Sequence, residues 1–239
     1  MADRPPRLAV LIDADNTSPK VADGLFDEVA KIGEASLRRI YGDFSKGQQA
    51  GWERVLQKHA ILAQQQFAYT TGKNSTDIAL VIDAMDLMHS GRFEGFCLVS
   101  SDSDFTRLAA RIREQGLDVY GIGQQKTPEA FRQACTRFVF TENFVREDGP
   151  APAKSTLRPM AEAVELIGKA LEQMEEDAEG WFQLGSVGQR MQNLSPEFDT
   201  RTFGYGKLSE LVEATGNFET NRDGPHVRLR PKPARRRKH

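Results

Sequence analysis

Acidic side chains follow directly after two apolar runs of this chain, and they are the residues best suited to chemistry. The segment "LAVLIDADNTS" ends a strand-like run in Asp13 and Asp15, with Asn16 beside them. The segment "FCLVSSDSDF" ends a second run in Asp102 and Asp104. Converging carboxylates repel one another unless a cation lies between them, and oxygen-only ligands suit Mg²⁺ or Mn²⁺. A cation held in this way can activate water for phosphodiester cleavage.

A third segment, "GKNSTDIALVIDAMD", adds acids on a predicted helix. Asp77 lies in the first turn of this helix, and Asp83 follows nearly two turns later. Each acid also has a purely structural interpretation. Asp102 could cap the helix that follows it, and Asp77 could favour the N-terminus of its own helix. Asp104 could bind the metal ion or could lie in the first turn of a helix. Asp83 could lie on the helix surface, form a buried hydrogen bond or contact the site.

The elements that must position these acids alternate along the first part of the chain. Strands alternating with helices predict right-handed crossovers and a parallel sheet with helices on both faces. In such a sheet, ligands bind beyond the C-terminal ends of the strands, where the strand order reverses. If the first and fourth strands are neighbours, their acids meet at one crevice. We expect strands at 8–13, 36–42, 60–66, 95–100, 117–122 and 137–140, and helices at 18–32, 46–58, 75–90, 103–115 and 127–135.

The pattern changes after the Pro/Ala-rich segment "REDGPAPAKSTL", which has the composition of a linker. The segment "FETNRDGPHVRLR" predicts a hairpin that turns at Asp223 and Gly224. Three helices and a hairpin are the outline of a winged helix, so the sequence predicts two domains. The helices are expected near 158–175, 181–193 and 203–215.

Composition excludes few classes of function. The net charge of −2 argues neither for nor against binding of nucleic acid. Any contact with a polyanion must therefore come from local patches of basic residues. The longest apolar runs have the length of strands, and "MADRPPR" lacks the apolar core of a signal peptide, so we expect a cytoplasmic protein without a membrane span. Cys97 and Cys135 lie in apolar segments and predict buried free thiols.

The motif "DADNT" also fits the D-x-D-x-T pattern of haloacid-dehalogenase-type phosphatases, in which Asp13 would be the nucleophile and Asp15 an acid/base. Those enzymes insert a flap after the first strand, whereas here a helix is expected to begin near Ser18. They also need a lysine ahead of a late pair of acids, and none precedes Ser100 at close range. This interpretation ranks second among the enzymes.

The three acidic motifs, in this order and spacing, resemble the NYN domain family of the PIN-like nuclease superfamily, and its bacterial LabA-like branch in particular. The resemblance implies an α/β fold, a PIN-like three-layer α/β/α sandwich with a central parallel sheet, and Mg²⁺- or Mn²⁺-dependent cleavage of RNA. Matched position by position, Asp13, Asp77 and Asp102 correspond to the metal-binding acids of the family. Asp104 corresponds to the second acid of its S-x-D-x-D-F motif, and Asn16 to the asparagine after the first strand.

The resemblance leaves three further positions to test. The superfamily often carries a further acid between the first strand and Asp77. In this chain the only candidate for it is Asp43, at the end of the second predicted strand. Lys73, just before the Asp77 helix, could bind a neighbouring phosphate or could be plain loop surface. Asn16 could bond the backbone of its turn or could orient Asp13 and a phosphate. PIN-like domains frequently dimerise, so the resemblance also allows a homodimer.

The second part of the chain has its own resemblance. The segment "FDTRTFGYGKLSELVE" and its surroundings are similar to the OST-HTH/LOTUS domain, which implies RNA binding in many cases and protein binding in others. The third helix and the wing of a winged helix usually face nucleic acid. Tyr205 could instead belong to the core, and the terminal "ARRRKH" could be a disordered tail that adds salt-dependent affinity. The expected RNA-binding residues are Arg201, Tyr205, Lys207, Arg222, Arg228, Arg230 and Lys232.

We therefore predict a ribonuclease domain at residues 7–143, a linker at 144–156, an OST-HTH/LOTUS domain at 157–231 and a basic tail at 232–239. The predicted function is metal-dependent cleavage of RNA, without a side-chain nucleophile, by a protein whose partner is RNA. The alternative from another class is a non-catalytic RNA-binding adaptor. In that case the acids hold a structural cation or none, and the second domain recruits a protein partner.

Overall fold

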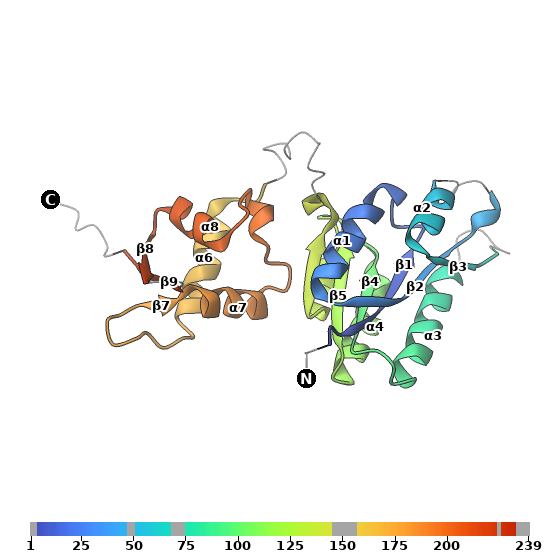
Figure 1. Cartoon of the computed structure of the whole chain (residues 1–239), viewed down its shortest axis with the longest axis horizontal. Coiled ribbons are helices and arrows are strands. Elements are labelled where there is room, and N and C mark those ends of the chain that lie inside the picture. Colours follow the sequence, from blue (N-terminus) through green and yellow to red (C-terminus); the bar gives the residue numbers. More distant parts are fainter. Residues whose placement is uncertain (1–3, 47–50, 68–74, 145–156, 224–225, 233–239) are drawn as a thin grey trace. The chain divides into compact units, whose positions relative to one another are not determined.

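The computed structural model divides into two compact units, Met1–Gly149 and Pro150–His239, and each is described by itself (Figure 1). Lys73, most of the expected linker and nearly all of the basic tail lie outside the described residues. No helix in the described part of the chain is long and apolar enough to cross a membrane. The structure describes residues 4–46, 51–67, 75–144, 157–223 and 226–232.

The first unit is built on a six-stranded sheet with the order β3-β2-β1-β4-β5-β6. Every neighbouring pair in this sheet is parallel. Since β1 lies between β2 and β4, the strand order reverses at β1. The first and fourth strands are therefore neighbours, which is the arrangement that brings their acids to one crevice. The strands are β1 (Arg7–Asp13), β2 (Glu34–Gly42), β3 (Leu62–Gln65), β4 (Gly95–Val99), β5 (Asp118–Gly123) and β6 (Arg137–Phe140).

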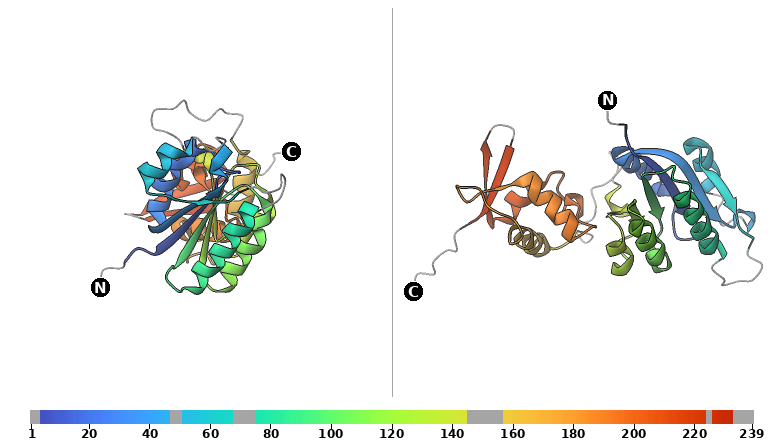
Figure 2. Two further views of the ribbon diagram at one scale, coloured as in Figure 1. Left: turned by 90° about the vertical axis from the view of Figure 1, so that its right-hand side faces the viewer. Right: turned by 90° about the horizontal axis from the view of Figure 1, so that it is seen from below.

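Helices cover both faces of this sheet, which gives the three-layer α/β/α sandwich (Figure 2). Alternate residues of β1 explain how: Leu8, Val10 and Ile12 are buried in the core shared with α1 and α2. Ala9 and Leu11 are buried in the core shared with α3, α4 and α5. A strand that is apolar on both sides belongs in the middle of such a sheet. The helices are α1 (Ala22–Ile32), α2 (Trp52–His59), α3 (Ser75–His89), α4 (Thr106–Glu114) and α5 (Glu129–Ala134).

The described residues of the second unit form three α-helices and a three-stranded antiparallel sheet of order β7-β9-β8, in agreement with the predicted winged helix. Its core is closed by fully buried apolar side chains, among them Ile167, Val187, Met191, Leu211 and Leu229. The elements are α6 (Met160–Leu171), β7 (Phe182–Gln183), α7 (Leu184–Leu194), α8 (Leu208–Thr215), β8 (Phe218–Asp223) and β9 (His226–Pro231).

The helix predicted at 203–215 is wrong in its first part. A 3-10 helix, Thr200–Phe203, ends at Gly204, whose φ is +88°. This left-handed conformation ends a helix and favours glycine. The chain re-enters a helix only at α8, after Lys207, whose extended backbone precedes the first turn.

Two other boundaries in this unit also differ from the prediction. Trp181 does not begin a helix, because Phe182 and the residue after it pair with β9 as strand β7. Asp223 is the last residue of β8 and pairs with His226, so it is not a turn residue as predicted. Local composition does not reveal a two-residue strand, since its stability comes from pairing with a distant partner.

Candidate metal centre

The acids of the three motifs are brought to the C-terminal edge of the sheet by three different elements. Asp13 is the last residue of β1, and Asp77 lies in the first turn of α3. Asp102 caps the short 3-10 helix that follows β4, and Asp104 lies within that helix. Because β1 and β4 are adjacent parallel strands, their ends lie side by side.

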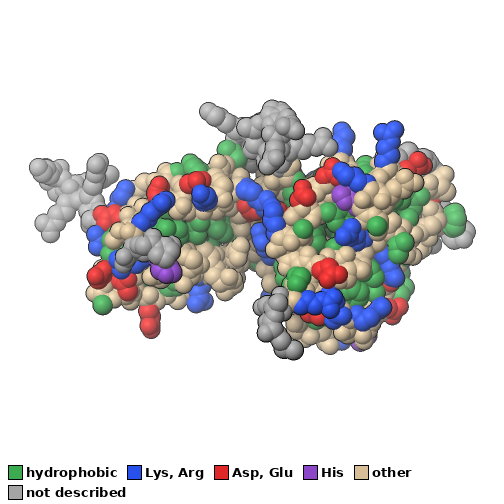
Figure 3. All heavy atoms as spheres, in the orientation of Figure 1, with side chains coloured by type: hydrophobic (Ala, Val, Ile, Leu, Met, Phe, Trp, Pro, Cys, Tyr) green, Lys and Arg blue, Asp and Glu red, His purple; other side chains and the backbone are tan. Residues whose placement is uncertain are grey.

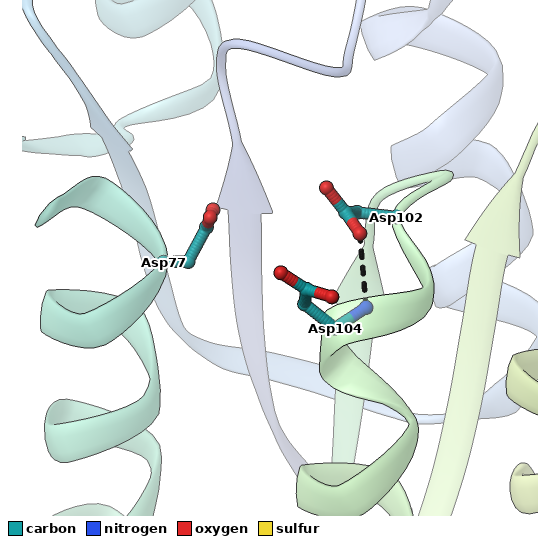
Figure 4. A group of neighbouring side chains, drawn as sticks. All are labelled: Asp77, Asp102 and Asp104. Atoms are coloured by element: carbon teal, nitrogen blue, oxygen red, sulfur yellow. Dashed lines mark hydrogen bonds between the residues drawn. The ribbon is translucent and has the colours of Figure 1, made fainter. Parts of the chain in front are cut away.

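Three of these carboxylates form a cluster (Figure 4). One oxygen each of Asp77, Asp102 and Asp104 lies within 4.8 Å of the others. Asp102 is also a cap, because its Oδ1 accepts a hydrogen bond of 2.9 Å from the backbone N–H of Asp104. Two ligands of one Mg²⁺ lie up to about 4 Å apart, so a small shift of side chains would let all three bind the same ion. This donor set fits Mg²⁺ or Mn²⁺.

Asp77 is the acid whose charge is least compensated. Burial raises its pKa, and the charges of Asp13, Asp102, Asp104 and Asp15 raise it further, to about 6. Every one of these effects disfavours the ionised form. The raised pKa of Asp77 therefore indicates mutual repulsion among several carboxylates. A bound cation would relieve this repulsion.

Asp13 is not one of the three clustered acids, and its carboxylate is held differently. Its side chain is fully buried. Its Oδ1 accepts from the backbone N–H groups of Asp15 and Asn16, at 3.0 and 3.3 Å. Its Oδ2 accepts from Nδ2 of Asn16 at 2.8 Å and from Oγ of Ser100 at 2.7 Å. Burial raises the pKa of Asp13, and these hydrogen bonds oppose the rise.

The structure thus groups Asp104 with Asp77 and Asp102, while Asp13 lies outside that set of three. A direct role for Asp13 as a metal ligand stays a prediction. Asn16 is exposed, and its amide orients Asp13, which is one of its two expected roles.

Ser100 is a residue that the sequence reasoning missed. Besides donating to Asp13, its Oγ accepts a 3.0 Å hydrogen bond from the backbone N–H of Asp102. It therefore ties the end of β1 to the loop that follows β4. Its place directly after a run of buried apolar residues is the signal that could have identified it.

Asp83 does not join the cluster. Its carboxylate accepts hydrogen bonds from Arg39 and from the hydroxyl of Tyr41, both on β2. Burial raises the pKa of Tyr41, and the carboxylate of Asp83 raises it further. Of the three alternatives for Asp83, the structure shows the buried hydrogen bond. This contact joins α3 to β2 of the sheet.

Asp43 belongs to a turn after β2. Its Oδ1 accepts from N and Oγ of Ser45, at 3.1 and 2.5 Å, and from Nε2 of Gln65 at 2.9 Å. It is not one of the three clustered acids. The geometry gives it a structural role at the end of β2.

Several arginines expected to bind RNA in the smaller unit pair with its own acids. Arg228 lies 3.2 Å from both Asp177 and Glu179. Arg201 forms hydrogen bonds of 2.6 to 3.1 Å with the carboxylate of Asp199. On the face drawn in Figure 3, acidic and basic side chains of this unit lie intermixed. The wing is therefore not a continuous basic surface.

Arg230 is paired in a similar way. It lies 2.7 Å from Glu219, and its guanidinium lies 4.3 Å from the ring centre of Trp181. The ring of Trp181 thus contacts two arginines of β9, Arg228 and Arg230, through cation–π interactions. Tyr205 packs, partly buried, against the core of the unit. The remaining expected residues, Lys207, Arg222 and Lys232, are exposed.

Two family models match the chain, one in each unit. The family model for the NYN domain matches residues 7–142, and the model for the OST-HTH/LOTUS domain matches residues 158–229. Among solved structures, a protein of unknown function from Vibrio parahaemolyticus is similar with a TM-score of 0.49 and 18% identity, over 58% of this chain and 94% of that chain. The comparison with curated proteins gives no match. The chain belongs to the NYN domain family of the PIN-like nuclease superfamily, and an OST-HTH/LOTUS domain follows its NYN domain.

Proposed function

We propose that this protein is a metal-dependent ribonuclease that hydrolyses phosphodiester bonds at the cluster of Asp77, Asp102 and Asp104. The observation that carries the proposal is the convergence of these three carboxylates, within 4.8 Å, at the C-terminal edge of the sheet of an NYN domain. The cluster contains only oxygen ligands, which is the donor set for Mg²⁺ or Mn²⁺.

A divalent ion bound here would lower the pKa of a water molecule and offset negative charge on the scissile phosphate. The residues of the chain have separate tasks around it. Asp77, Asp102 and Asp104 supply the oxygens, and Asp102 is fixed in direction by its capping hydrogen bond. Asp13, held by Ser100 and backbone N–H groups, adds a fixed negative charge that is close enough to raise the pKa of Asp77. No side chain needs to act as a nucleophile.

The phosphatase alternative requires Asp13 to attack a phosphate. Both oxygens of its buried carboxylate already accept hydrogen bonds, and its Oδ2 is held by Asn16 and Ser100. A nucleophilic oxygen needs a free lone pair and a path to the substrate. The geometry therefore supports the nuclease over the phosphatase.

We further propose that the OST-HTH/LOTUS domain brings the nuclease to its RNA, directly or through a protein partner. The exposed side chains of Lys207 and Arg222 support direct contact with RNA. The pairing of Arg228 with Asp177 and Glu179 limits how much of the wing takes part.

The test is cleavage of labelled single-stranded and structured RNAs with Mg²⁺, Mn²⁺ or EDTA. It uses the wild type, Asp102→Asn, Asp13→Asn and, as a control, Asp86→Asn. Asp86 is exposed on α3, so its substitution makes the same chemical change outside the cluster. We expect metal-dependent cleavage that Asp102→Asn and Asp13→Asn abolish and Asp86→Asn leaves intact.

Calorimetry shows whether each variant binds Mn²⁺, and circular dichroism shows whether it remains folded. Intact RNA in every lane, with RNA binding retained by the wild type and by Asp102→Asn, would refute the nuclease and favour the adaptor. Hydrolysis of small phosphomonoesters through a covalent intermediate on Asp13 would favour the phosphatase.

A further inference from the structure

The outer surface of two neighbouring helices borders the metal centre. Helices α3 and α4 lie side by side on one face of the sheet, and both run away from the clustered acids (Figures 2 and 4). Asp77 lies in the first turn of α3, and Asp104 lies in the 3-10 turn that leads directly into α4. The exposed side chains in the first turns of these helices therefore form the surface next to the proposed ion.

Contacts on both sides of α4 show which of its side chains lie toward α3. Asp104 lies on that side, because its carboxylate clusters with Asp77 of α3. Arg113 lies on the other side, because its Nη1 donates to two backbone carbonyls at the end of α5, at 3.4 and 3.5 Å. A 3-10 helix has about 3.0 residues per turn and an α-helix about 3.6, so positions three and seven residues after Asp104 share its side. These two positions are Arg107 and Arg111.

Arg107 is the arginine of α4 that is best placed to act at the metal centre. It is exposed, and its guanidinium forms no ion pair or hydrogen bond with any residue in the described part of the chain. It follows Asp104 by one helical turn, a rise of about 5 Å. Arg111 lies one turn further away and is paired with Glu114 at 3.1 Å. The buried residues on the opposite side of this segment are Phe105, Leu108, Ala109 and Ile112.

The exposed side of α3 is apolar over the same distance from the acids. Ile78 directly follows Asp77 and is 59% exposed, and Ile82 is 57% exposed. The two isoleucines lie four residues apart and therefore on one side of the helix. Neighbouring exposed apolar side chains indicate an interaction surface, whereas single ones are common on any protein. The exposed acids Asp86 and Glu114 lie in later turns of the two helices, so this surface covers about two turns, or about 11 Å.

A guanidinium beside a pair of exposed apolar side chains matches the chemistry of a single-stranded nucleotide. A guanidinium binds two oxygens of one phosphate in its planar geometry. The faces of unpaired bases are open to apolar contact, whereas those of a duplex are stacked. A protein partner could cover the isoleucines, but the unpaired charge of Arg107 beside a site for phosphodiester cleavage favours RNA.

We propose that Arg107 binds the phosphate next to the scissile one in single-stranded RNA, and that Ile78 and Ile82 pack against the sugar and base of the adjoining nucleotide. The proposal rests on the ribonuclease function proposed above and adds residues that bind its substrate. It places the path of the RNA over the first two turns of α3 and α4, beside the acids.

The test measures binding of the full-length protein to a fluorescein-labelled oligouridylate of about ten nucleotides, within the usual site sizes for single strands. Fluorescence anisotropy in EDTA, over a range of salt concentrations, measures affinity without cleavage. The second unit is the same in every variant, so a change in salt dependence reports the contact that was removed. The variants are Arg107→Ala, Arg107→Lys and Ile78→Thr. Arg92→Ala is the control, because Arg92 is exposed in the loop before β4, at the opposite edge of the sheet.

Arg107→Ala should lower the slope of log affinity against log salt by about 0.7, the value for one phosphate of a single strand. It should also weaken binding about fivefold near 0.1 M salt. Arg107→Lys should keep the slope, because its charge still binds the phosphate. Ile78→Thr should weaken binding about threefold without changing the slope, because an apolar contact releases no counterion. In cleavage assays with Mn²⁺, Arg107→Ala should raise KM and leave kcat unchanged.

The rival role for Arg107 is to neutralise the clustered acids. In that role Arg107→Ala would bind Mn²⁺ more tightly in calorimetry, because a repelling charge is removed, and would leave the salt slope for RNA unchanged. This pair of results would overturn the proposal, and so would an unchanged affinity of Ile78→Thr for RNA. Thermal unfolding of each variant checks that the fold persists.

The same measurements separate this proposal from the ribonuclease function. If the wild type does not cleave RNA but binding still depends on Arg107 and Ile78, the ribonuclease function fails and the binding surface stands. If RNA is cleaved and the variants bind RNA as Arg92→Ala does, the binding surface fails and the function stands.

Discussion

Replacing Asp77 by asparagine should make the metal-free protein more stable while removing a ligand of the proposed metal centre. The pKa of Asp77 is raised from its ordinary 3.8 to about 6, through burial and the charges of neighbouring carboxylates. A difference of about two pH units corresponds to about 3 kcal/mol in favour of the protonated form. Because the side chain is partly exposed, solvent screening reduces this to about 1.5 kcal/mol. Asparagine removes the charge and should recover about that amount.

The effect has a defined dependence on pH. The folded protein holds the proton of Asp77 more tightly than the unfolded chain does, so stability is lost as pH rises from about 4 to about 6. In EDTA, Asp77→Asn should therefore raise the free energy of unfolding by about 1.5 kcal/mol at pH 8 and by almost nothing near pH 4. Urea denaturation followed by circular dichroism at both values measures this difference.

Asp86→Asn is the matched control, because it makes the same change on an exposed side of the same helix. A saturating divalent ion should reverse the order of stability. The wild type gains about 2.7 kcal/mol at an ion concentration of 100 times Kd, whereas Asp77→Asn gains little. If Asp77→Asn is no more stable than Asp86→Asn at pH 8 in EDTA, the repulsion inferred for the cluster is refuted.

Further predictions concern packing and are all read as free energies of unfolding from urea titrations. Tyr41→Phe should destabilise the protein by about 1–2 kcal/mol, because Asp83 loses a buried hydrogen-bond donor; an unchanged stability would contradict the role of this contact. Gly123→Ala should cost about 1–3 kcal/mol, since its Cβ would lie 2.5 Å from the carbonyl oxygen of Ser100. Gly168→Ala, where nothing lies within 4 Å of the new Cβ on α6, should instead stabilise by about 0.5–1 kcal/mol, and a loss there would argue against the packing of this helix.

The larger unit was predictable because its strands carry their own signal. Runs such as "LAVLI" and "FCLV" are apolar on both faces, and each is a fully or nearly fully buried strand of the parallel sheet. Once β1 and β4 are neighbours, the acids that follow them must meet, so the position of Asp102 beside the end of β1 follows from topology. The sequence does not specify which oxygens converge, because that depends on caps and rotamers.

The contacts that the sequence did not predict depend on packing between distant elements. Asp83 binds Arg39 and Tyr41 only because α3 crosses β2, and no spacing within "DIALVIDAMD" indicates this partner. In the smaller unit, the helical pattern is interrupted at Gly204, whose backbone is in the left-handed conformation. The surrounding sequence otherwise predicts a continuous helix. The pairing of Arg228 with acids far away in the sequence likewise appears only once β9 is placed.

Asp13 and Asp77 illustrate why burial alone does not identify a metal ligand. Burial is the largest influence on both and raises both pKa values. At Asp13 the opposing influences are hydrogen bonds from Ser100, Asn16 and backbone N–H groups, so the protein itself stabilises the charge. At Asp77 the further influences are neighbouring carboxylates, which only add to the cost of ionisation. The hydrogen bonds of Asp13 offset part of the effect of burial on its pKa, whereas every neighbouring charge at Asp77 adds to it, so the proposed cation would relieve more repulsion at Asp77.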